Sequence, residues 1–160
     1  MAVEPESLRQ AMRSWATGVT IVTAAHAGVQ HGMTVSAFTS LTLEPPQVLV
    51  SLARNSRTHD LILRAKSFGV TILAADQQEL SERFAGRIPD DSDRLAGLET
   101  FSLTTGTPLL AGGLSHLDCR LVTTLECGTS TLFIGEVVAA KNLPDGNPLL
   151  YFNRDYRQIK

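Results

Sequence analysis

The polar cluster Asn55-Ser56-Arg57-Thr58 combines residue types that could bind an anion. It follows an apolar run at residues 48–52 and precedes a segment whose apolar residues share one helical face over residues 58–65. Amides at a helix N-terminus, two hydroxyl groups and a guanidinium together suit a phosphate group. An equally good interpretation is that Ser56 or Asn55 only caps the helix and that Arg54 and Arg57 face solvent. The segment alone therefore leaves both interpretations open.

A second group of small hydroxyl residues alternates with apolar residues along a predicted strand and its end. Small side chains let a planar ligand approach the backbone, whose amides can bond to ring oxygens and nitrogens. Such residues are also ordinary on the wet face of a strand, and taken alone the group favours that explanation. The group consists of Thr34, Ser36, Thr39 and Ser40, interleaved with Val35, Ala37 and Phe38.

The four histidines have no metal-binding spacing, and no convincing nucleophile with a paired base appears in the sequence. We expect His31 on the surface of a hairpin, His59 facing solvent from the first turn of a helix, and His116 as a structural residue in a strand. No GxSxG segment occurs. The sequence therefore predicts no metal site and argues against acyl transfer and metal-dependent hydrolysis.

Composition restricts the classes of function. With 160 residues, 43% of them hydrophobic, the chain can build one core, and we expect a single domain over residues 1–160. A formal charge of -2 with scattered basic residues argues against nucleic acid or an acidic membrane as partner. Cys119 and Cys127 lie in no metal or disulfide motif, and the first ten residues do not resemble a signal peptide. We therefore expect reduced thiols and a cytoplasmic protein.

Many short β-like segments must position these clusters. We expect strands over residues 18–25, 33–39, 48–52, 68–73, 101–104, 114–126, 131–141 and 149–152. Helices are expected over residues 5–16, 58–65 and 77–84, the first laying Leu8, Met12 and Trp15 on an apolar surface. Residues 87–113 read as long loops that could form a lid or a dimer contact, and residues 144–148 as a turn. Without βαβ alternation or a Gly-rich phosphate loop, the pattern predicts a mainly β fold, a β-barrel with short flanking helices.

Taken in order, nine segments make the chain similar to the flavin reductase family of split-barrel proteins, the reductase partners of two-component flavin monooxygenases. The resemblance covers nearly the whole chain, and the ordered set is far more specific than any one piece. The segments are MRSWATGVTIVT at residues 12–23, GMTVSAF at 32–38, PP at 45–46, NSRT at 55–58, RFA at 83–85, GTPL at 106–109, LDC at 117–119, LFIGEV at 132–137 and PLLYF at 148–152.

The resemblance implies a homodimer of FMN-binding split barrels. FMN, or FAD, would bind non-covalently and accept hydride from NADH or NADPH, and a monooxygenase partner would receive the reduced flavin. Matched position by position, the flavin ring would be lined by Thr34, Val35, Ser36 and Ala37, with Ser51, Leu52 and Ala53 beneath it. The phosphate would be held by Asn55, Ser56 and Thr58 with help from Arg57. Phe84 would border the flavin, and Tyr151, Arg154 and Tyr156 the nicotinamide.

One departure affects the reductant side. Family members commonly carry Gly-Asp-His before the strand that holds Phe133, whereas this chain has Gly128-Thr129-Ser130, so Ser130 stands where the resemblance places a histidine near the nicotinamide. The leading hypothesis is an NAD(P)H-dependent flavin reductase that needs no catalytic side chain, because the two cofactors carry the electrons. The alternatives are a non-catalytic flavin-binding dimer and a split-barrel electron-transfer flavoprotein or oxidase with another donor.

Overall fold

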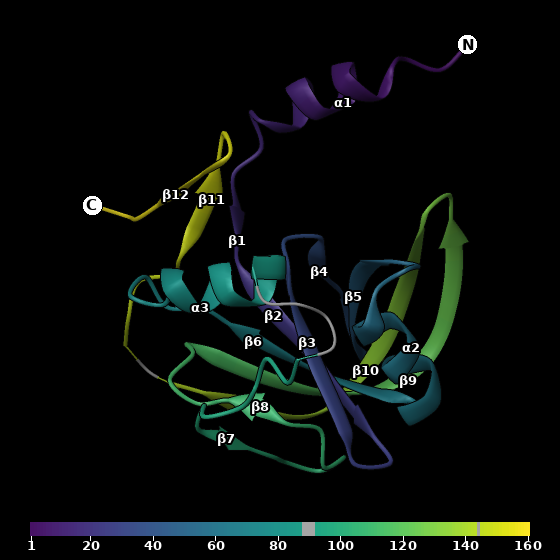
Figure 1. Ribbon diagram of the computed structural model, residues 1–160, viewed down its shortest axis with the longest axis vertical. Coiled ribbons are helices and arrows are strands. Elements are labelled where there is room, and N and C mark those ends of the chain that lie inside the picture. The colour runs from purple at the N-terminus through teal and green to yellow at the C-terminus, as the bar shows by residue number, and fades with distance from the viewer. Residues whose placement is uncertain (88–91, 144) are drawn as a thin grey trace.

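The main structural feature is an antiparallel sheet with the strand order β3-β2-β6-β9-β10-β5-β4 (Figure 1). The computed structural model describes residues 1–87, 92–143 and 145–160. Parts of the loop predicted over residues 87–113 and of the turn predicted over residues 144–148 thus lie outside the described residues. The strands are β2 (Thr20–His26), β3 (Val29–Val35), β4 (Phe38–Leu43), β5 (Pro46–Ala53), β6 (Ser67–Ile72), β9 (Ser115–Cys127) and β10 (Ser130–Asn142).

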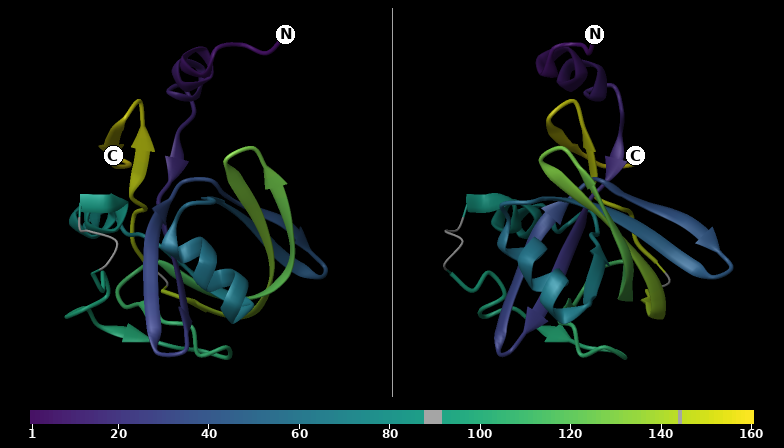
Figure 2. Two further views of the ribbon diagram at one scale, coloured as in Figure 1. Left: turned by 45° about the vertical axis from the view of Figure 1, so that its right-hand side comes forward. Right: turned by 90° about the vertical axis from the view of Figure 1, so that its right-hand side faces the viewer.

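The sheet curls because its two edge strands follow one another in the chain. Strand β3 passes into β4 through Ser36 and Ala37, although β3 and β4 lie at opposite edges. At this corner the amide of Ser51 donates to the carbonyl oxygen of Ala37 at 3.0 Å. Helix α2 (Arg57–Ala65) packs against β2, β3 and β5 within the curl (Figure 2). The mainly β fold with short helices is confirmed, but the strand expected over residues 33–39 is wrong, because it bends at this corner.

Two groups of buried residues hold these layers together. One fills the curl and includes Val50, Ile62, Phe68 and Phe133. A Cβ atom at Gly135 would lie 2.6 Å from the Phe68 ring, so β10 needs glycine where this ring packs against it. The other group contains Ile21, Leu73 and Phe84 and joins the sheet to the segments that follow β6.

Smaller elements surround the sheet. Strands β1 (Thr17–Gly18), β11 (Leu150–Phe152) and β12 (Asp155–Arg157) form a three-stranded sheet, and β7 (Thr100–Phe101) pairs with β8 (Leu109–Leu110). Helix α3 (Gln78–Glu82) continues into the π-helical turn η1 (Arg83–Arg87). The C-terminal hairpin thereby lies beside the chain entering β2, and together with α3 and η1 it frames one end of the curled sheet.

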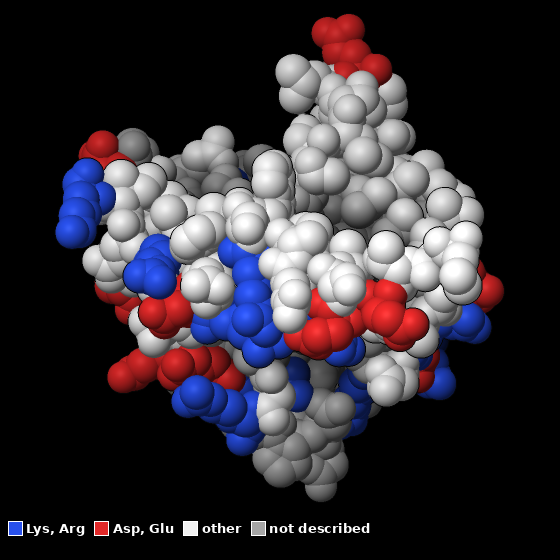
Figure 3. Space-filling view, turned by 90° about the horizontal axis from the view of Figure 1, so that it is seen from above, with Lys and Arg blue, Asp and Glu red and all other residues white. Residues whose placement is uncertain are grey.

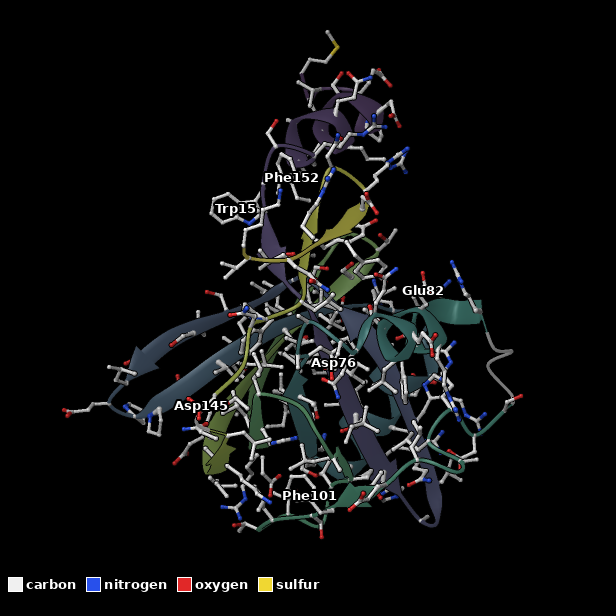
Figure 4. The ribbon with its side chains drawn as sticks, turned by 90° about the vertical axis from the view of Figure 1, so that its left-hand side faces the viewer. Trp15, Asp76, Glu82, Phe101, Asp145 and Phe152 are labelled. Carbon is white, nitrogen blue, oxygen red and sulfur yellow. The ribbon has the colours of Figure 1, made fainter. Side chains whose placement is uncertain are left out.

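Helix α1 (Pro5–Met12) stands away from the rest of the chain (Figure 1). It buries none of its residues, and Trp15, which is 66% exposed, projects sideways between α1 and the body (Figure 4). This one chain therefore does not provide the apolar surface on which the helix is expected to lie. Its apolar stripe has no partner among the described residues of this one chain.

The surface carries charges of both signs. Basic and acidic side chains lie close together on the face seen in Figure 3, in keeping with the small formal charge. On α1 itself, Arg9 pairs with Glu6 at 3.1 Å. In the described part of the chain, no helix is long and apolar enough to cross a bilayer.

Candidate functional site

A cavity of about 490 Å³ opens where β3, the start of α2, α3 with η1, and the C-terminal hairpin meet. It brings together eight residues expected from the sequence: Thr34, Ser36, Ala53, Asn55, Ser56, Phe84, Tyr151 and Tyr156. Its other lining residues are Val19, His31, Met33, Ser81, Ala85, Gly86 and Arg94. Segments far apart in the sequence therefore converge on one space.

Ser56 is the N-cap of helix α2. Its Oγ accepts from the backbone amide of His59 at 3.3 Å and donates to the carbonyl oxygen of Ala53 at 2.8 Å. The capping interpretation of the cluster is thus confirmed for Ser56, whose only hydroxyl proton is used within the chain. A phosphate accepts hydrogen bonds, so at this end of the cavity it would be met by the amide side chain of Asn55 and by first-turn amides of α2, which have no partner within the helix.

Thr58 and Arg57 do not line the cavity, contrary to the expected phosphate site. Thr58 is fully buried, and its Oγ1 lies 2.8 Å from Nδ1 of His31. Arg57 lines a separate surface pocket beside the β2–β3 turn. The first helical turn points these two side chains away from the cavity entrance. His31, expected on a surface, is itself only 1% exposed.

Strand β3 and the corner that follows it supply one wall of the cavity. His31, Met33 and Thr34 of β3 line the cavity together with Ser36 of the corner, whereas Val35 is buried in the core. The Thr34 hydroxyl donates to the backbone oxygen of Ser81 at 2.6 Å. Thr34 Oγ1 is therefore left as an acceptor toward a ligand.

In β5, successive side chains point to different spaces. Ala53 lines the cavity, Ser51 lines a neighbouring apolar pocket of about 650 Å³, and Leu52 is buried in the core. The neighbouring pocket also contains Ala37, and Val19 and Ser36 line both spaces. Val35 and Leu52 can thus offer a ligand in the cavity only backbone groups, which corrects their expected place in the lining.

Aromatic side chains form the far side of the cavity. Phe84 is buried against Gly32, where a Cβ atom would lie 2.9 Å from its ring. Tyr151 and Tyr156 pack edge to face with ring centroids 5.4 Å apart. A planar ligand could lie among these rings, with an anionic end at Asn55 and the start of α2.

Two residues expected on the nicotinamide side do not line the cavity. Arg154 lies at the turn of the C-terminal hairpin and lines a shallow pocket beside α1 together with Trp15 and Tyr151. Ser130 opens β10 and pairs in register with Ala53, so it is separated from the cavity by one strand. The structure places Ser130 beside the cavity wall but does not bring Arg154 to it.

Sequence reasoning missed Ser81 and Arg94. Ser81 is fully buried in α3, and Arg94, which is 4% exposed, donates through Nη1 to the backbone oxygens of Gly32 and Phe84 at 3.1 and 3.0 Å. Neither residue belongs to a motif used for the prediction. Their location depends on how α3 and Arg94 pack against β3, as the hydrogen bonds of the Ser81 backbone oxygen with Thr34 and of Arg94 with Gly32 show, and no local pattern reports this packing.

The two thiols lie outside the cavity and differ in character. Burial, reinforced by the neighbouring carboxylate of Asp118, raises the pKa of the Cys119 thiol to about 12, so this thiol stays protonated at neutral pH. Cys127 is exposed near the tip of the β9–β10 hairpin. Among the described residues, no three His, Cys, Asp or Glu side chains gather as a metal site.

Comparisons with known proteins identify chains built in the same way. Residues 12–160 match the sequence model of the flavin reductase like domain. An NADH-dependent flavin reductase of a Rhodococcus species is 38% identical over 99% of this chain and 88% of its own length. The reductase component of a 4-nitrophenol 4-monooxygenase/4-nitrocatechol 2-monooxygenase of Rhodococcus opacus is 42% identical over 94% of this chain and 78% of its own.

Solved structures agree with the sequence comparison. A putative flavin reductase of Haemophilus somnus superposes with a TM-score of 0.93 at 32% identity, covering 98% of this chain and 100% of its own. The NADH:FAD oxidoreductase of Streptomyces globisporus superposes with a TM-score of 0.91 at 30% identity, covering 100% and 98% of the two chains. These similarities extend over the whole curled sheet and the cavity.

Proposed function

The chain belongs to the family of flavin reductase like domains, and from this membership we propose that it binds FMN and reduces it with NADH. Reduced flavin would then pass to a partner monooxygenase, because one relative of this chain is the reductase component of a monooxygenase. The observation that carries the proposal is the cavity that joins aromatic walls to the N-terminus of α2. FAD remains an alternative flavin, since related enzymes are named for FMN and for FAD, and NADPH remains an alternative reductant.

The residues of the cavity fit a flavin mononucleotide. Asn55 and the first-turn amides of α2 would hold its phosphate, and Thr34 would accept a hydrogen bond from a ring N–H. Ser36 and Ala53 are small enough to let the ring approach the backbone of β3 and β5. Phe84 would close the buried margin of the ring. We propose this arrangement as the flavin site of a split-barrel fold.

When bound, flavin supplies the hydride acceptor, so the chain needs neither a nucleophile nor a general base. The contribution of the protein is to seat two rings within transfer distance and to exclude water. Tyr151 and Tyr156, which line the cavity, would border the nicotinamide, with Ser130 next to Ala53. The alternatives of a flavin binder without catalysis and of an electron-transfer protein or oxidase with another donor are not favoured by relatives that are NADH-dependent reductases.

We also propose a homodimer. Leu8, Met12 and Trp15 are each more than half exposed in the isolated chain, and Trp15 also lines the apolar pocket that contains Ala37. In a homodimer, a second copy of the chain would cover this exposed apolar stripe. Replacing Trp15 by Glu should shift the molar mass measured by light scattering toward that of one chain of 17.3 kDa. A wild-type protein of that mass with FMN bound would count against the dimer.

We place the reaction in the cytoplasm, which supplies NADH and keeps thiols reduced, and where Cys119 and Cys127 would remain free as they are in the structure. The direct test is NADH oxidation by the purified protein with added FMN, compared with FAD and with no flavin. The proposal requires oxidation that depends on flavin. Oxidation at the rate of the protein-free control would contradict it.

A further inference from the structure

Ser81 and Tyr156 form a hydroxyl pair at the wall of the cavity. Ser81 Oγ lies 2.8 Å from the phenolic oxygen of Tyr156, and the two residues come from helix α3 and strand β12, which are 75 positions apart in the chain. Ser81 is fully buried, whereas Tyr156 is half-buried and faces the cavity. The pair therefore links the one buried residue of α3 to a residue that a ligand can touch.

The burial of Ser81 decides which oxygen donates. Among the described residues, Tyr156 is the only hydrogen-bond partner of the Ser81 hydroxyl. If the phenol donated to Ser81, the serine proton would be buried without an acceptor, which costs more than a normal hydrogen bond contributes. If Ser81 donates instead, its proton is satisfied, and the Tyr156 O–H can turn toward the cavity. The second arrangement is the favourable one.

We propose that Ser81 is a positioning residue that holds the Tyr156 hydroxyl as a hydrogen-bond donor for the carboxamide oxygen of the nicotinamide. This inference rests on the proposed function, because it takes the reductant to be NADH. The carboxamide on the nicotinamide ring has an oxygen that accepts hydrogen bonds, so a phenol held as a donor is a suitable partner for it. The neighbouring Tyr151 packs edge to face on Tyr156 and restricts the tilt of its ring.

The test compares Ser81→Ala, Tyr156→Phe and the double variant, each saturated with FMN. We expect each single variant to raise the KM for NADH and the Kd for NAD⁺, measured by calorimetry, by about three- to tenfold, with kcat and FMN affinity kept. The double variant should be no worse than Tyr156→Phe, because Ser81 acts through the tyrosine. In reduced thionicotinamide adenine dinucleotide, sulfur replaces the carboxamide oxygen. With this reductant, the KM values of wild type and Tyr156→Phe should differ much less than they do with NADH.

A matched control is Ser67→Ala, which removes a buried serine hydroxyl that lies 3.1 Å from Thr107 Oγ1, outside the cavity. It should lower thermal stability as Ser81→Ala does, without changing the KM for NADH. Additive losses in the double variant, an unchanged Kd for NAD⁺, or equal losses with the thionicotinamide probe would each overturn the role of Ser81. If wild type does not oxidise NADH at all, the proposed function fails and this inference with it, whereas normal wild-type turnover with unchanged variants overturns this inference alone.

Discussion

Nδ1 of His31 lies 2.8 Å from the hydroxyl oxygen of Thr58, and both side chains are buried. The contact ties β3, which forms one wall of the cavity, to the first turn of α2, whose amides face the proposed phosphate. Thr58 thus contacts a residue of the cavity wall from the buried side, whereas the family resemblance placed it against the phosphate. This hydrogen bond therefore helps to hold α2 against β3.

Replacing Thr58 by Val should therefore affect stability before ligand affinity. Valine keeps the shape but removes the hydroxyl partner of His31, and losing a buried hydrogen bond costs about 1 to 3 kcal/mol of unfolding free energy. Chemical denaturation measures this loss, and Thr58→Ser, which keeps the hydroxyl, is the control. A preference for FMN over riboflavin should persist in the valine variant. Loss of that preference with unchanged stability would return Thr58 to the phosphate site.

Asn55 is expected to contribute directly to phosphate binding. Its exposed amide lines the cavity at the start of α2, and a hydrogen bond to a charged group contributes about 1.5 to 3 kcal/mol. Asn55→Ala should weaken FMN binding about tenfold or more and leave riboflavin binding unchanged, as followed by quenching of flavin fluorescence. Equal losses for both flavins would place Asn55 at the ring.

Ser130 tests the departure from the family pattern. It pairs with Ala53, a cavity residue, so a larger side chain at this position can reach the reductant side. Ser130→His should lower the KM for NADH a few-fold with little change in FMN affinity, because an imidazole adds a ring that can pack on the nicotinamide. Thr129→His, one residue earlier, is the control and should have no such effect. If both variants behave alike, this part of the hairpin does not seat the reductant.

The two cysteines should differ in reactivity. At pH 8 a thiol reagent should modify only Cys127 in the folded chain, because Cys119 is buried and its pKa is raised from 9.0 to about 12. After unfolding, the reagent should modify both thiols. Above pH 9 the unfolded chain releases this proton while the folded chain keeps it, so Cys119 lowers stability progressively with rising pH. Cys119→Ala should flatten the fall in melting temperature between pH 9 and 11. Two reactive thiols in the folded chain would show that Cys119 is accessible.

The sequence predicted the class of fold and the segments of the site better than the directions of individual side chains. Helix α2 and most strands follow from periodicity, and Thr34 and Asn55 do line the cavity. Val35 and Leu52 do not, because the resemblance names consecutive residues whereas a strand turns every second side chain into the core. Ser81 could not be predicted, since only the fold brings it to Tyr156. The single domain over residues 1–160 stays a prediction.

The most direct test of the central claim is anaerobic mixing of FMN-loaded protein with one equivalent of NADH, while the absorbance of oxidised flavin is followed. If the cavity seats both rings for hydride transfer, the flavin absorbance should fall in a single phase, with loss of one NADH per flavin. The rate should far exceed that of free FMN with NADH at the same concentrations. Tight FMN binding with flavin absorbance that stays constant, or falls only at the rate of free FMN, would contradict the account.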